Sequence, residues 1–62
     1  MRYRIYFEAL QPIEVEAFDL RVTGARRIAC KVSVEEMCTV DLCFPCEIKR
    51  IADNHDRDIY IK

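Results

Sequence analysis

Hydrophobic and polar residues alternate over the first eight positions of the chain. Tyr3, Ile5 and Phe7 share one side of this segment, and polar or charged side chains fall between and around them. A period of two with aromatic and β-branched residues is typical of a strand that buries one face. We therefore predict a β-strand over residues 2–8.

The next apolar segment, residues 13–22, changes phase part way along. Apolar residues occupy odd positions up to Ala17 and even positions from Phe18 onward. A β-bulge shifts the alternation by one residue in this way. We predict a second strand over residues 13–22 with a bulge near Ala17 and Phe18.

Residues 26–32 fit two patterns. Ile28, Cys30 and Val32 alternate as in a strand, whereas a helical stripe through the same segment includes two alanines. Gly24 suits a tight turn between two strands better than a helix interior. We predict a strand over residues 26–32.

A capping pattern starts the following segment. Ser33 and Glu36 have the spacing of a capping box at a helix N-terminus. Residues at helical spacing follow and Pro45 ends the run, so we predict a short helix over residues 34–43. Alternation of Val40, Leu42 and Phe44 leaves a strand open as the alternative.

Two further strands complete the chain. They span residues 46–51 and 58–62, and a polar turn around residues 53–57 joins them. The predicted fold is an α+β domain over residues 1–62, with an antiparallel sheet of four to five strands and one short helix. An all-β small barrel is the alternative.

Composition narrows the class of protein. The chain has 62 residues, 52% of them hydrophobic, with 10 Lys and Arg against 11 Asp and Glu. Ample apolar surface and little net charge exclude intrinsic disorder, and the sequence contains no apolar run that could cross a membrane. The basic start has no apolar core of a signal peptide, so we expect a cytoplasmic protein.

Four cysteines suggest a zinc-stabilised fold as one alternative. Cys43 and Cys46 have the C-x-x-C spacing with which two thiolates bind one Zn²⁺, and Cys30 and Cys38 would complete the site. The spacing of Cys30 and Cys38 does not repeat the motif, and both thiols fit apolar faces, where free cysteine is often buried. We therefore expect no cofactor, with zinc as the alternative.

An acidic patch is the first candidate binding surface. It would form if the second strand and the helix share a face, and it would engage a basic groove on a protein partner. The set comprises Glu14, Glu16, Asp19, Glu35, Glu36 and Asp41.

A basic and aromatic set offers the alternative partner, nucleic acid. Single strands bind where bases stack on aromatic rings above positive charge. The set comprises Arg2, Arg4, Tyr6, Arg26 and Arg27. The near-neutral composition argues against it, because dedicated nucleic-acid binders carry an excess of positive charge.

No catalytic motif is present in the sequence. The one histidine, His55, lies in a polar segment without a neighbouring Ser or Cys, and neither a phosphate-binding loop nor an H-E-x-x-H motif occurs. A chain this short also has little material for the walls of a ligand pocket. We therefore expect no enzymatic activity.

The remaining class is a small interaction protein. Exposed sheet edges are ready to pair with a larger protein or complex, or with a second copy in a homodimer. In its small size and its lack of catalytic motifs, the chain is analogous to the small proteins by which phages or mobile elements inhibit host machines, such as anti-CRISPR proteins. A nucleic-acid-binding module, zinc-stabilised through Cys43 and Cys46, is the alternative function.

Overall fold

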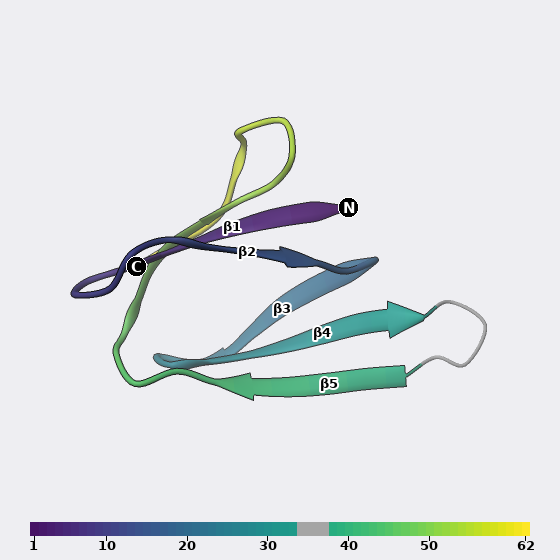
Figure 1. Cartoon of the computed structure of the whole chain (residues 1–62), viewed down its shortest axis with the longest axis horizontal. Helices are drawn as coiled ribbons and strands as arrows, with labels where there is room; N and C mark the ends of the chain where they lie inside the picture. The colour runs from purple at the N-terminus through teal and green to yellow at the C-terminus, as the bar shows by residue number, and fades with distance from the viewer. Residues whose placement is uncertain (34–37) are drawn as a thin grey trace.

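A computed structural model describes residues 1–33 and 38–62, and every regular element in these residues is a β-strand. The strands are β1 (Arg2–Phe7), β2 (Ile13–Glu16), β3 (Asp19–Gly24), β4 (Arg27–Ser33), β5 (Cys38–Cys43), β6 (Ile48–Ala52) and β7 (Asp58–Ile61). They form two antiparallel sheets, one in the order β2-β1-β6-β7 and one in the order β3-β4-β5 (Figure 1).

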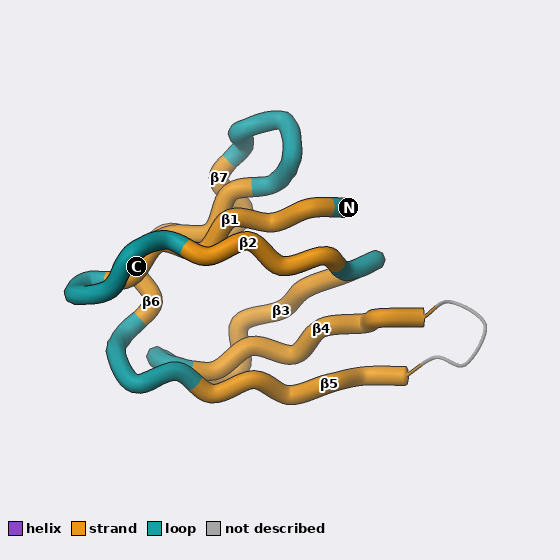
Figure 2. The backbone as a smooth tube through the Cα atoms, viewed as in Figure 1, coloured by secondary structure: helices purple, strands orange, loops and turns teal. Residues whose placement is uncertain are grey.

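The predicted α+β class and its helix are wrong. Residues 34–37 lie outside the described residues, and the remainder of the predicted helix is strand β5, paired along β4 (Figure 2). Cys38 and Leu42 fit a helical stripe and an alternating strand equally well, and Val40 belongs only to the strand pattern. The edge of β4 provides hydrogen-bond partners for the backbone N–H and C=O groups of Cys38–Cys43. Pairing with this distant strand therefore overrides the local capping pattern.

The phase change near Ala17 and Phe18 is a corner between the two sheets. The Ala17 N–H donates to the carbonyl of Met1 beside β1 (2.9 Å), whereas the Phe18 N–H donates to the carbonyl of Lys31 in β4 (2.8 Å). The predicted single strand is therefore divided into β2 and β3, one in each sheet. Strands that switch sheets at a bend are a recurrent way to build such corners.

Side chains from the two sheets share one core. Ile5, Ile28 and Ile51 are fully buried, and they come from β1, β4 and β6. The alternation predicted for residues 2–8 is confirmed, because Tyr3, Ile5 and Phe7 are buried while Arg2 and Arg4 are exposed.

The connection between β5 and β6 closes one end of this core. The ring of Phe44 meets Phe7 edge to face, with 4.9 Å between centroids. The Phe44 and Ile48 N–H groups donate to the carbonyls of Arg26 and Ala25 in the β3–β4 turn. These contacts fix the connection against both sheets.

The polar turn predicted between the last two strands is present. The Asp53 carboxylate accepts the N–H groups of His55 and Arg57 (2.9 and 3.0 Å), which lowers its pKa. Asp56 has a φ of 59°, the left-handed conformation that completes the turn. No helix long and apolar enough to cross a membrane occurs in the described part of the chain.

Candidate interaction surface

The inner face of the three-stranded sheet is covered unevenly by the other sheet. Its side chains form rows across β3, β4 and β5, because directly paired residues point to the same side. In the middle row Leu20 pairs with Cys30 and Cys30 pairs with Val40. Leu20 and Cys30 are buried, yet Val40 is 39% exposed. In this row coverage therefore ends between β4 and β5, whereas Leu42, two residues further along β5, still packs against the core.

Apolar side chains near the β4–β5 connection are exposed as well. Phe18 is 57% exposed, Val32 is 43% exposed, and Cys38 is also exposed. By alternation along β4 and β5, Val32 and Cys38 lie on the same side as Cys30 and Val40, whereas Phe18 lies at the corner just before β3. We call the uncovered residues Phe18, Val32, Cys38 and Val40 the open flank.

Strand β5 gives the open flank an unpaired edge. β5 pairs with β4 on one side and with no described residue on the other. Its six residues contain one charge, Asp41, and no proline. Natural sheets usually protect their edges with charges, bulges or short strands. β5 has one charge and one register shift, between Lys31 and Ser33 of β4 and opposite the first residue of β5.

The other edges are better protected. β2 is four residues long and carries Glu14 and Glu16, and β7 is four residues long and begins with Asp58. β3 carries Asp19 and Arg21 and has a register shift near its end. Among the described strands, β5 is the edge best suited to accept another strand.

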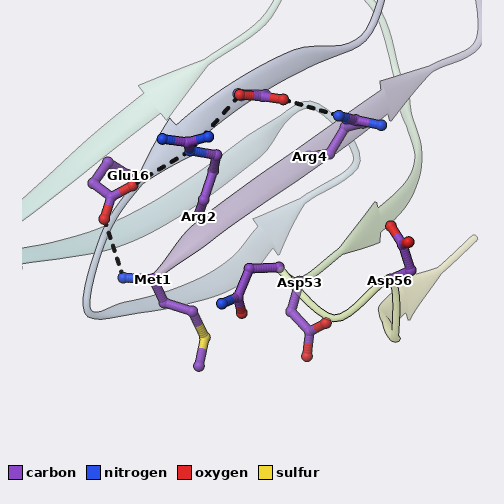
Figure 3. A pocket seen from close by; sticks show the side chains of 8 residues that line it. Met1, Arg2, Arg4, Glu16, Asp53 and Asp56 are labelled. Atoms are coloured by element: carbon purple, nitrogen blue, oxygen red, sulfur yellow. Dashed lines mark hydrogen bonds and ion pairs between the residues drawn. The ribbon is translucent and has the colours of Figure 1, made fainter.

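The basic residues predicted to bind nucleic acid are divided between two surfaces. Arg2 and Arg4 lie on the outer face of the four-stranded sheet, beside an open pocket (Figure 3). Its lining residues are Met1, Arg2, Arg4, Glu14, Glu16, Asp53, Asn54 and Asp56. Arg26 and Arg27 belong to the turn and start of β4 in the other sheet.

Carboxylates neutralise the cations in this pocket. Arg4 donates to Glu14 at 2.9 Å, and this hydrogen bond lowers the pKa of the Glu14 carboxyl. Arg2 lies 3.8 Å from both Glu14 and Glu16, and the terminal amine lies 3.3 Å from Glu16. The surface is an ion-pair network with little excess positive charge to attract phosphate.

The acidic residues predicted to bind a protein do not form one patch. Glu14 and Glu16 lie on the outer face of the four-stranded sheet, in the network just described. Asp19 and Asp41 lie on the outer face of the three-stranded sheet, where Asp19 accepts the N–H of Leu20 at 3.0 Å. Glu35 and Glu36 lie outside the described residues.

The four cysteines occupy different environments. Cys30 is in the core, where burial raises the pKa of its thiol, and Cys38 belongs to the open flank. Cys43 is exposed and Cys46 is half-buried beside the core. Among the described residues, no group of three or more His, Cys, Asp or Glu side chains could hold a metal ion. Zinc binding stays a prediction.

Sequence reasoning missed the open flank. Phe18, Val32 and Val40 all have the apolar alternation of buried strand residues, and the alternation that included Val40 was the available signal for β5. Which of these residues remain exposed depends on how far the opposite sheet extends over them.

No protein-family model, no curated protein and no solved structure matches this chain.

Proposed function

We propose that this chain is a non-enzymatic protein-binding module that pairs the β5 edge with an extended strand of its partner. The observation that supports this function is the open flank beside an unpaired, weakly protected edge. In strand addition, main-chain hydrogen bonds supply affinity and alternate side chains supply specificity.

The two faces of β5 define the chemistry of the partner strand. Val40 and Leu42 face the inner side, so the partner strand places apolar side chains there at alternate positions. Thr39 and Asp41 face the outer side, so the partner places hydrogen-bond donors opposite them. Such a strand removes Val40 from water and continues the three-stranded sheet.

We further propose that the module acts in the cytoplasm by occluding a surface of a larger protein. This places it with small phage- or mobile-element-encoded inhibitors of host machines, of the anti-CRISPR kind. The proposal of this biological role rests on analogy in size and on the absence of catalytic motifs in the sequence.

The test compares two exposed apolar positions on different edges. Val40→Glu places a charge on the open flank, whereas Ile61→Glu places one on β7, where Ile61 is 67% exposed. Tagged protein is mixed with an untagged second copy and, separately, with a nuclease-treated bacterial lysate. Bound proteins are then identified by mass spectrometry.

We expect wild type and the Ile61→Glu variant to retain the same partner, and the Val40→Glu variant to lose it. Circular dichroism checks that both variants keep the strand content of the wild type. A Val40→Glu variant that is folded and retains every partner of the wild type would contradict the proposed function.

A further inference from the structure

We propose that the strand partner of β5 is β5 of a second copy, paired antiparallel about a twofold axis at Val40. This inference rests on the proposed function, since it names the partner of the same edge. The resulting dimer contains a six-stranded antiparallel sheet built from two three-stranded sheets.

Nothing in the described part of the molecule blocks this edge. β4 is the strand with which β5 makes its extensive contacts, and the four-stranded sheet ends before it reaches Val40. A second β5 strand can therefore lie alongside without displacing any described strand.

The faces of the sheet restrict the register. A twofold axis perpendicular to the sheet keeps the inner faces of both copies on one side, so each inner residue must oppose an inner residue. The axis must then pass midway between one residue of β5 and the same residue of the second copy. Centring it on Val40 or on Asp41 pairs five residues of each described strand, and centring it on Thr39 pairs only three.

Charge decides between the two longer registers. An axis at Asp41 places this carboxylate opposite its own copy, and directly opposed like charges destabilise a strand pair. An axis at Val40 places Asp41 opposite Thr39 of the second copy, whose hydroxyl can donate to the carboxylate. The Val40-centred register is therefore self-complementary on the outer face.

The same register is complementary on the inner face. Val40 lies opposite Val40 of the second copy, and Cys38 lies opposite Leu42 of the second copy. These pairs bring two exposed Val40 side chains together, where cross-strand contact between β-branched residues is favourable. Every pair in the Val40-centred ladder is thus apolar with apolar or hydroxyl with carboxylate.

Oligomeric state is the first test. Sedimentation velocity of the full chain under reducing conditions, over a range of concentrations, should show a dimer for wild type and for the Ile61→Glu variant. The folded Val40→Glu variant should remain a monomer at the same concentrations. A monomeric wild type overturns the inference, and a partner lost only by Val40→Glu would then still support the proposed function.

Disulfide cross-linking tests the register. Cys38, Cys43 and Cys46 are replaced by Ser, which leaves the buried Cys30, and either Val40→Cys or Thr39→Cys is added, both of which keep Asp41. Oxidised glutathione accepts the electrons of the two thiols as the inter-copy disulfide forms. Because the Val40 positions are directly opposed and the Thr39 positions are not, we expect Val40→Cys to cross-link about tenfold faster than Thr39→Cys.

The cross-linking result has two outcomes that overturn the inference. Faster cross-linking of the Thr39→Cys variant rejects the Val40-centred register. Equal, slow cross-linking of both variants in a protein that sediments as a dimer shows that the dimer uses another surface.

Discussion

The guanidinium of Arg50 lies over the ring of Tyr6, with its central carbon 4.1 Å from the ring centroid. Tyr6 and Arg50 are directly paired across β1 and β6, and Arg50 also lies 3.5 Å from Asp58 at the start of β7. This chain of contacts ties three strands together on the outer face. It also covers the ring face on which a nucleic-acid base would stack.

The first prediction concerns this cation–π contact. Tyr6→Leu removes the ring and should lower the free energy of unfolding by about 0.5–1 kcal/mol, the usual range at exposed sites. Tyr6→Phe keeps the ring and should match wild type within about 0.3 kcal/mol. Urea denaturation measures both variants, and an equal loss in both would contradict a role for the ring.

The second prediction concerns the shared core. Ile28 is fully buried at the centre of the three-stranded sheet. Ile28→Ala should lower the free energy of unfolding by about 2–4 kcal/mol, and Ile28→Val by about 1 kcal/mol, because each leaves a cavity. Ile61→Ala, at an exposed position, should change it by less than about 0.5 kcal/mol. Urea denaturation followed by circular dichroism tests this order.

The third prediction concerns alkaline pH. Burial raises the pKa of the Cys30 thiol above its ordinary value of 9.0, so the folded state keeps a proton that the unfolded chain has released. Stability is therefore full below pH 9.0 and falls as pH rises above it.

Denaturation at a series of pH values measures this slope. Cys30→Ala should reduce it, whereas Ile61→Ala, which removes no titratable group, should leave it unchanged. Burial also raises the pKa of Tyr3, so part of the alkaline loss should persist at higher pH in the Cys30→Ala variant. An unchanged slope in the Cys30→Ala variant would show that the Cys30 thiol does not cause the loss of stability at alkaline pH.

The fourth prediction concerns the turn between β6 and β7. Asp56 has a positive φ, which a β-branched residue adopts at a cost of about 1–2 kcal/mol and glycine adopts freely. Asp56→Val should lower the free energy of unfolding by about that amount, and Asp56→Gly should not lower it. Equal stability of the two variants, measured in urea, would argue against a left-handed Asp56.

A strand could be predicted from the sequence where its own residues alternate clearly between apolar and polar. The alternation of Tyr3, Ile5 and Phe7 identifies β1 without knowledge of its partners. β5 was not predictable in this way, because Cys38 and Leu42 fit two periodicities. The available edge of β4 selects the strand, and that edge exists only once β4 has formed.

The candidate surface depends still more on long-range arrangement. Val32 and Val40 resemble core residues in sequence, and they are exposed because the four-stranded sheet stops short of them. The pairing of Arg4 with Glu14 likewise depends on the register between β1 and β2. A local sequence pattern does not show how far one sheet extends over another, and it does not show which residues of two strands pair.

The protection of β7 determines the size to which a self-paired assembly can grow. Pairing β5 with β5 uses the same surface on both copies and stops at two. Pairing β5 with β7 of the next copy would be a head-to-tail contact, which can repeat from copy to copy and builds a filament when it does not close into a ring. β7 is short, its Asp58 is held by Arg50, and the following Lys62 lies 3.1 Å from Glu47. These charges disfavour the head-to-tail contact, so an assembly of the proposed β5-paired kind would stop at two copies.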